Sequence, residues 1–100
     1  MAISSYTPKE AHARLQQVRS SARNQSHALQ QRRDALIADL GEVAAEYRAL
    51  GRVEAANEVL RAIGPVAAAF DGRVMAVQSQ LEADTEALVD IMLEGVETDA

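Results

Sequence analysis

The chain lacks cysteine entirely, and its 100 residues include only three aromatic residues, five glycines and two prolines. Without cysteine there is no disulfide framework, no thiolate nucleophile and no cysteine-ligated zinc site. Few aromatic residues disfavour a β-sheet, and few glycines and prolines favour long helices. Apolar residues make up 48% of the chain, but twenty residues are alanine, which suits close helix packing. The composition predicts one small all-α domain.

A hydrophobic segment long enough to cross a bilayer is also missing, because the longest apolar run covers only residues 66–70. The first five residues lack the basic and then apolar order of a secretory signal. One lysine stands beside nine arginines, a usage that follows GC-rich codons and indicates a bacterium or a phage of such a host. We expect a cytoplasmic protein of a bacterial host or a virion-associated protein, with no membrane partner.

Charge is divided between the two ends of the chain. Residues 9–33 carry six cations and one anion, whereas residues 71–94 carry six anions and one cation. This asymmetry predicts a chain folded back on itself, with the two segments side by side. The net charge of −5 argues against general nucleic-acid binding, which needs a basic face.

Helix signals place the elements. Thr7-Pro8-Lys9-Glu10 is typical of a capped helix start, and Leu50-Gly51-Arg52 is typical of a helix stop. Proline within a helical pattern produces a kink. The expected order is a helix over about 8–50, a turn at 51–52, a helix over about 53–63, a kink at Gly64-Pro65, a helix over about 66–94 and an acidic tail at 95–100.

A heptad pattern predicts which side chains face inward. In the first helix the seam comprises Leu15, Val18, Ala22, Gln25, Leu29, Arg32 and Leu36, then a stutter, then Leu40, Val43, Tyr47 and Leu50. Folding the chain at Gly51 pairs Gln25 with Gln78 and Arg32 with Asp71. We expect these polar layers to fix the register, although Arg32 and Asp71 pointing to solvent is an equally open alternative. The prediction is a long antiparallel, coiled-coil-like helical hairpin with a kinked second arm.

Apolar residues near the C-terminal end exceed what a hairpin can cover. Residues 88–93 are apolar around most of the helix, which predicts more than one neighbour. We expect self-association into a dimer or higher oligomer, most simply a four-helix bundle, or docking on another protein. The expected partner-binding residues are Leu88, Val89, Ile91, Met92, Leu93, Glu82, Glu86 and Asp90. The alternative is a monomeric three-helix bundle with breaks at Gly41 and Gly64.

Motifs for catalysis are absent from the sequence, which has no Gly-rich phosphate loop, nucleophile elbow or zinc-binding His-Glu-x-x-His. His12 and His27 lie about four helical turns apart, too far to share a ligand. We therefore expect no catalytic residue, no cofactor and no metal. The carboxylate ladder of Glu82, Glu86, Asp90 and Glu94 is interpreted either as a solvated face or as a surface for a basic partner.

Two resemblances are local. Tyr47-x-x-Leu50-Gly51-Arg52-x-Glu54-Ala55 is similar to the inter-helix turn of a tetratricopeptide repeat, but it occurs once, and such arrays contain several copies. Length and a central glycine resemble the small hairpins exported by type VII secretion, without their tryptophan. Neither resemblance assigns a functional role to a residue of this chain. The sequence predicts a non-enzymatic helical interaction protein, a structural or assembly component of a phage or bacterial complex, or alternatively an acidic inhibitor that covers a basic surface of a host protein.

Overall fold

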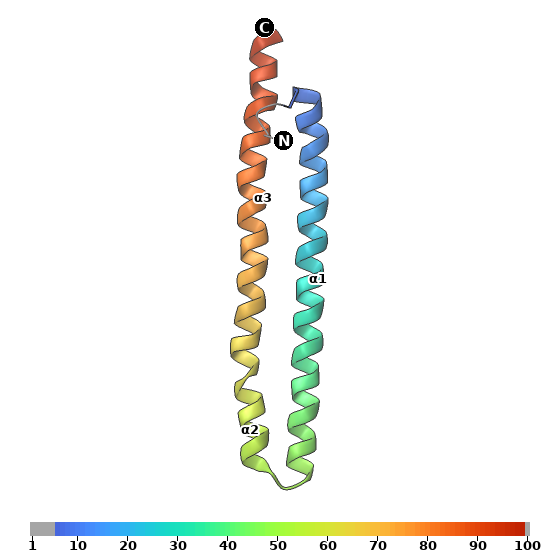
Figure 1. The fold of residues 1–100 in the computed structure, drawn as a ribbon, viewed down its shortest axis with the longest axis vertical. Helices are drawn as coiled ribbons and strands as arrows, with labels where there is room; N and C mark the ends of the chain where they lie inside the picture. Colours follow the sequence, from blue (N-terminus) through green and yellow to red (C-terminus); the bar gives the residue numbers. More distant parts are fainter. Residues whose placement is uncertain (1–5, 100) are drawn as a thin grey trace. The chain divides into compact units, whose positions relative to one another are not determined.

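The computed structural model describes residues 6–99, and it describes side chains as far as Glu94. Three α-helices follow one another: α1 spans Pro8–Ala49, α2 Val53–Arg61 and α3 Ile63–Asp99. The described residues contain no strand. α1 forms one arm of an antiparallel hairpin, and α2 with α3 forms the other (Figure 1). The predicted all-α hairpin is confirmed.

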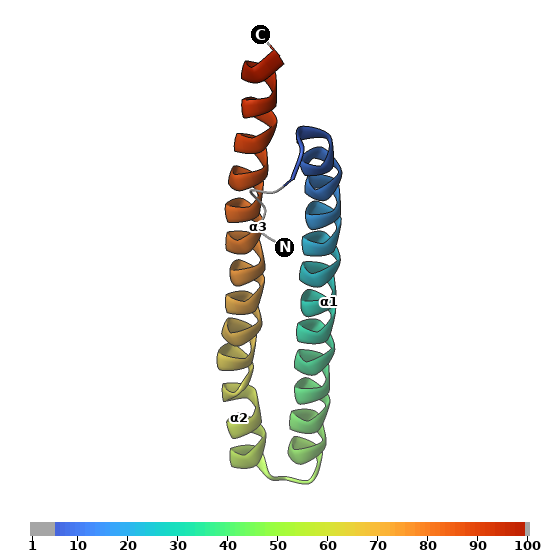
Figure 2. The same cartoon turned by 45° about the horizontal axis from the view of Figure 1, so that its top comes forward.

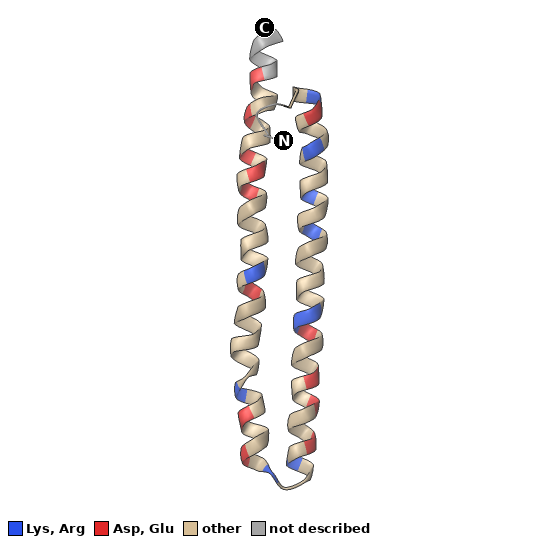
Figure 3. Cartoon of the chain, in the orientation of Figure 1, with Lys and Arg blue, Asp and Glu red and all other residues tan. Residues whose placement is uncertain are grey.

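Two compact units divide the hairpin, and each takes a stretch from both arms. Unit 1 combines residues 1–25 with residues 76–100, and unit 2 is the continuous stretch 26–75. Within each unit the two helical stretches run side by side in both views (Figures 1 and 2). Unit 1 therefore brings the basic start of α1 next to the acidic end of α3, as the charge asymmetry predicted (Figure 3).

α1 begins at the predicted capping sequence. The backbone N–H of Glu10 donates to the Thr7 hydroxyl oxygen at 3.2 Å, and that hydroxyl donates to the Glu10 carboxylate at 2.9 Å. Pro8 takes the first helical position, where its missing N–H has no intrahelical partner to lose. In the usual capping box the carboxylate accepts from the backbone N–H of the cap residue instead. The predicted start is confirmed, with a different donor to the carboxylate.

The turn at Gly51 is a Schellman motif. The N–H of Arg52 donates to the Tyr47 carbonyl at 2.9 Å, and the N–H of Gly51 donates to the Arg48 carbonyl at 3.0 Å, which are the two bonds that define this helix ending. Gly51 has a φ of +78°, a conformation that glycine adopts without steric cost. The Arg52 guanidinium lies 5.3 Å from the centroid of the Tyr47 ring, in place of the apolar contact common in this motif.

The second arm is interrupted at Ala62 rather than at the predicted kink at 64–65. α2 ends at Arg61 and α3 starts at Ile63, so Pro65 occupies the third position of α3. Residues of the first helical turn need no intrahelical acceptor for their N–H, whereas a proline farther along would remove a bond and crowd the preceding turn. Ending α2 early therefore places Pro65 where it costs least. Ala62 keeps a right-handed helical conformation, with φ −74° and ψ −17°, so the interruption is local.

Alanine dominates the buried core. Unit 1 buries Ala11, Ala22 and Leu88, and Leu88 is the one large side chain of the described residues with less than 2% exposure. Unit 2 buries Ala44, Ala56 and Val74. Small side chains let two helices approach closely, but each removes little apolar area from water. The hairpin therefore derives only modest stability from its own core.

Inward-facing positions of α1 recur every eleven residues. Ala11, Ala22 and Ala44 are buried, and Arg33, which takes the remaining place in this series, is half-buried. On the other arm, half-buried side chains follow the same interval: Val59, Phe70, Leu81 and Met92. Eleven residues complete three turns at 3.67 residues per turn, close to the natural period of an α-helix, whereas a heptad seam requires 3.5.

Both predicted polar layers are consequently wrong by about one position. A heptad seam drifts by about 20° per repeat relative to a straight helix, so the inward positions move from Gln25 to Ser26 and from Arg32 to Arg33. Gln25 is exposed and bonds within its own helix. Arg33, not Arg32, reaches Asp71 across the hairpin at 2.8 Å.

The bounds of α1 and α3 test two further predictions, the three-helix bundle and the acidic tail. Gly41 lies inside the uninterrupted α1, so the three-helix bundle with a break at that glycine is excluded. α3 continues to Asp99, and the residues expected as an acidic tail at 95–100 are therefore helical as far as Asp99. Among the described residues, no helix combines the length and the apolar character that a membrane span requires.

Candidate interaction surfaces

The apolar run near the end of α3 is divided between core and surface. Leu88 is fully buried in unit 1, Val89, Ile91 and Met92 are half-buried, and Leu93 is 55% exposed. An α-helix has 3.6 residues per turn, so consecutive residues point in different directions. The hairpin thus uses Leu88 for its own core and leaves Leu93 as the large apolar side chain of this run that is most accessible to another molecule. Binding of a partner here stays a prediction.

The predicted carboxylates occupy an exposed face of α3 in unit 1. Glu82, Glu86 and Asp90 are exposed, and their spacing of four residues places them on one side of the helix. None of the three forms a salt bridge with another residue of the described part of the chain. Although the basic stretch of α1 lies alongside, it does not neutralise these carboxylates by direct contact.

A shallow groove of about 230 Å³ lies between the two stretches of unit 1. It is lined by Arg14, Gln17, Val18, Ser21, Ala22, Gln25, Val77, Gln80, Leu81 and Asp84. Polar groups on its rim bond along their own helix, as in the 2.9 Å bond that the Gln80 amide donates to Asp84. The lining includes the Ser21 hydroxyl, whose oxygen accepts a 2.9 Å hydrogen bond from the Gln25 amide.

A three-residue charge cluster connects the arms of unit 2. Arg33 donates through Nη1 to Asp71 at 2.8 Å and through Nε to Asp34 at 3.1 Å. The hydrogen bond to Asp71 first, and then the bond to Asp34, raise the pKa of Arg33, which stays charged at any physiological pH. The side chains of Asp71 and Asp34 are 57% and 69% exposed. Two carboxylates share one guanidinium, so the cluster presents a net negative charge to solvent.

Neither histidine joins a cluster of ligands. His12 belongs to unit 1 and His27 to unit 2, and both side chains are exposed. Among the described residues there is no group of three or more histidine, cysteine, aspartate or glutamate side chains placed to hold a metal ion.

Most of the large apolar residues that are exposed belong to unit 2. The large apolar residues exposed in the described chain are Leu36, Val43, Leu50, Val53, Leu60, Met75 and Leu93. All except Leu93 fall within residues 26–75. The sequence prediction had placed several of them in the seam, because they are apolar and seven residues apart. The inward positions are instead spaced by eleven residues, and alanines occupy them. The larger residues therefore point outward.

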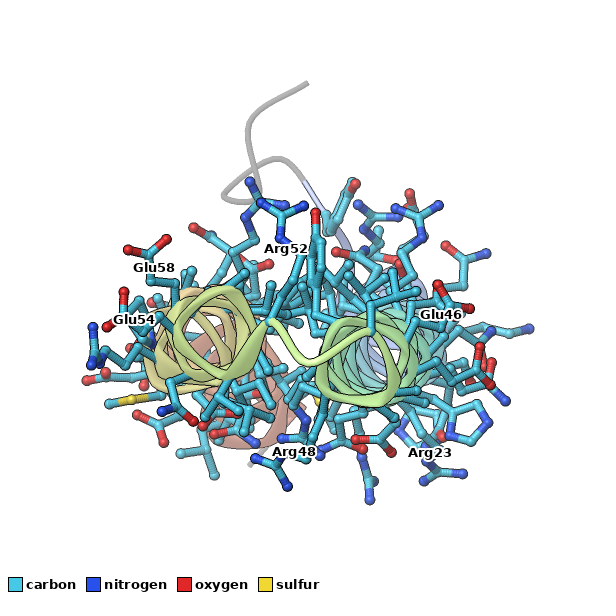
Figure 4. All side chains as sticks on the ribbon, turned by 90° about the horizontal axis from the view of Figure 1, so that it is seen from below. Arg23, Glu46, Arg48, Arg52, Glu54 and Glu58 are labelled. Carbon is cyan, nitrogen blue, oxygen red and sulfur yellow. The ribbon has the colours of Figure 1, made fainter. Side chains whose placement is uncertain are left out.

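Three of these residues form a stripe along α1, which we call the Leu36 stripe: Leu36, Val43 and Leu50, with exposures of 39%, 40% and 73%. Their spacing of seven residues keeps them on one side of the helix. Tyr47 lies among them, and Arg52 covers its ring. The stripe therefore lies on the edge of unit 2 that carries the Arg52 side chain in Figure 4.

The opposite edge of unit 2 carries Arg48 (Figure 4). Asp34 is fourteen residues before Arg48, nearly four helical turns, and so faces the same way. Asp71 shares Arg33 with Asp34, which brings α3 onto this edge. From their spacing of three, four or seven residues along each arm, we assign eleven residues to this surface and call it the Arg48 face: Asp34, Ala38, Gly41, Ala45 and Arg48 on α1, with Val53, Leu60, Gly64, Ala67, Asp71 and Met75 on the second arm.

The apolar members of the Arg48 face follow from helical spacing. Val59 and Phe70 are both half-buried, so the eleven-residue interval continues across the interruption at Ala62. Leu60 and Asp71, one position after each, therefore face the same way, and Met75 follows Asp71 by one turn. Val53 precedes Leu60 by two turns. Their exposures are 51% for Val53, 39% for Leu60 and 65% for Met75. Unit 2 thus has exposed apolar side chains on two opposite edges.

Comparison with known proteins finds nothing similar: the chain matches no family model, no curated protein and no solved structure.

Proposed function

We propose that the chain is a non-enzymatic helical interaction protein, a small structural or assembly component of a phage or bacterial complex. The observation that supports this proposal is the contrast within unit 2 between its core and its surface. The buried side chains there are Ala44, Ala56 and Val74, whereas six larger apolar side chains are exposed. Apolar side chains exposed together on one face are typical of protein-binding surfaces, which supports the proposal.

Surface area supports the same proposal. The accessible surface of the chain is 7221 Å², whereas a compact monomer of 10.8 kDa exposes roughly 5,500 Å². Covering apolar surface stabilises by about 25 cal/mol per Å². A hairpin with this much uncovered area therefore gains substantially from a neighbouring chain.

The test combines two measurements on the intact chain. Sedimentation over a wide concentration range reports self-association, and affinity capture from bacterial cells, with and without phage infection, reports a stoichiometric partner. The proposal expects a defined oligomer or a defined complex. A protein that stays monomeric at high concentration and captures no stoichiometric partner contradicts it.

A second candidate function has its own observation. Glu82, Glu86 and Asp90 are exposed and have no salt-bridge partner among the described residues, which favours an acidic inhibitor that covers a basic surface of a host protein. Such a complex weakens as salt rises, because salt screens exposed charges. Reversing all three carboxylates to lysine should abolish the complex, whereas reversing the three exposed glutamates Glu46, Glu54 and Glu58 in unit 2 serves as the charge-matched control.

A further inference from the structure

We propose that the Arg48 face binds a second copy of this chain, antiparallel and related by a two-fold axis near Gly41, so that Arg48 of each copy lies opposite Asp34 and Asp71 of the other. The inference rests on the proposed function and deepens it, because it names the partner, the surface and the register.

Charge complementarity determines the orientation. At one end of the Arg48 face, Asp34 and Asp71 share the single cation of Arg33 and retain a net negative charge. At the other end, Arg48 is exposed and has no carboxylate within salt-bridge distance among the described residues. The two ends are fourteen residues apart on α1, about 21 Å. An antiparallel two-fold arrangement brings opposite charges together twice, whereas a parallel one places Arg48 against Arg48.

Apolar residues fit in the same register. When Arg48 lies opposite Asp34 of the second copy, Met75 of one copy reaches the level of Val53 of the other. Leu60 reaches the level of Gly64 and Ala67 of the second copy, where small side chains leave room for it. One register therefore pairs the charges and the exposed apolar residues together, as an isologous interface requires.

Gly41 lies where the two-fold axis passes. A Cβ atom added at Gly41 would have no heavy atom within 4 Å, so packing inside the hairpin does not require glycine there. Glycine inside a helix costs about 1 kcal/mol relative to alanine. A second α1 packed closely at this position would explain why residue 41 is glycine, because a larger side chain would hold the two helices apart.

The Leu36 stripe offers no such match. Val43 is flanked along α1 by Asp39 and Glu46, one helical turn before and after it, and both are exposed. A two-fold contact centred on Val43 would bring these carboxylates of both copies together. Like charges across an interface oppose association, so the second copy takes the Arg48 face.

The absence of native cysteine permits a direct test by disulfide formation. Gly41→Cys should form a covalent dimer rapidly under mild oxidation, because the two Cβ atoms meet at the axis. Val43→Cys, on the opposite edge of α1, is the matched control and should remain monomeric on a denaturing gel. In sedimentation experiments Arg48→Glu should weaken the dimer at least about tenfold, whereas Arg52→Glu should leave its dissociation constant unchanged.

The outcomes separate this inference from the proposed function. A dimer that cross-links through Val43→Cys but not through Gly41→Cys overturns the proposed face and leaves an interaction protein. A chain that is monomeric at every concentration overturns the inference outright, and it also contradicts the proposed function if no stoichiometric partner is captured. Equal weakening by Arg48→Glu and Arg52→Glu overturns the proposed register.

Discussion

The Nη1 atom of Arg33 lies 2.8 Å from Oδ1 of Asp71, which ties the middle of α1 to α3 across unit 2. These two residues are 38 positions apart in the sequence. Arg33 takes an inward position that alanine holds eleven residues before and after it. Its guanidinium extends from that position to the surface and reaches both carboxylates there, as a long side chain with an apolar stem can. A polar residue therefore occupies the seam without leaving a buried charge.

Arg33→Gln and Arg32→Gln should differ although the two positions are adjacent. Removing the guanidinium at 33 breaks the bonds to Asp71 and Asp34, so the melting temperature should fall. Arg32 is exposed and has no salt bridge among the described residues, so its substitution should change little. Circular dichroism melts at low and high salt measure both, and the difference should shrink at high salt because the cluster is exposed. Equal effects of the two substitutions would contradict the structural register.

Local signals made much of the fold predictable. The cap at Thr7 and the turn at Gly51 each depend on a few consecutive residues whose backbone chemistry is specific. The charge asymmetry predicted which segments lie side by side. The seam was harder, because alanine is the main core residue and packs at almost any helical position. Larger residues at Leu36 and Val43 pointed to a heptad seam, and the signal that was missed is the eleven-residue interval from Ala11 to Ala22 and on to Ala44.

The candidate surface was harder to predict than the fold for a related reason. Residues 88–93 were conspicuous as an apolar run, but the hairpin uses Leu88 for its own core. Leu36, Val43 and Leu50 were assigned to the seam, but all three are exposed. Predicting which residues are exposed requires knowing which side of each helix faces inward. An error of one residue in that assignment rotates the predicted face by about 100°.

Two glycines should respond oppositely to alanine. Gly51 has a φ of +78°, so Gly51→Ala should destabilise the hairpin by roughly 1–2 kcal/mol, the cost of a left-handed conformation with a Cβ atom. Gly72 lies inside α3, where an added Cβ meets no heavy atom within 4 Å. Gly72→Ala should therefore stabilise by up to about 1 kcal/mol. Urea unfolding at fixed protein concentration measures both, and the same sign of change at the two positions would be inconsistent with the observed turn.

Pro65→Ala should join α2 to α3. The substitution restores a backbone N–H that can donate to the carbonyl of Arg61, and it removes the ring that crowds the preceding turn. Backbone chemical shifts of residues 61–63 should become fully helical, and the melting temperature should rise. Pro8→Ala is the matched control, because a proline at the first helical position removes no intrahelical bond. An interruption that persists at Ala62 after Pro65→Ala would show that the proline does not cause it.

Leu88→Ala and Leu93→Ala should separate the core from the surface of the apolar run in α3. Leu88 has 0% exposure and Leu93 has 55%. Truncating a fully buried leucine typically costs about 2–5 kcal/mol, because transfer free energy is lost and a cavity remains. Truncating an exposed leucine changes stability by at most about 0.5 kcal/mol.

Urea unfolding gives the free energies of unfolding of both variants. With Leu88→Ala, amide exchange should show protection lost first in residues 6–25 and 76–94. If Leu93→Ala destabilised the isolated chain as much as Leu88→Ala, the inward face of α3 would have to be reassigned, because only a buried side chain leaves a cavity when it is removed.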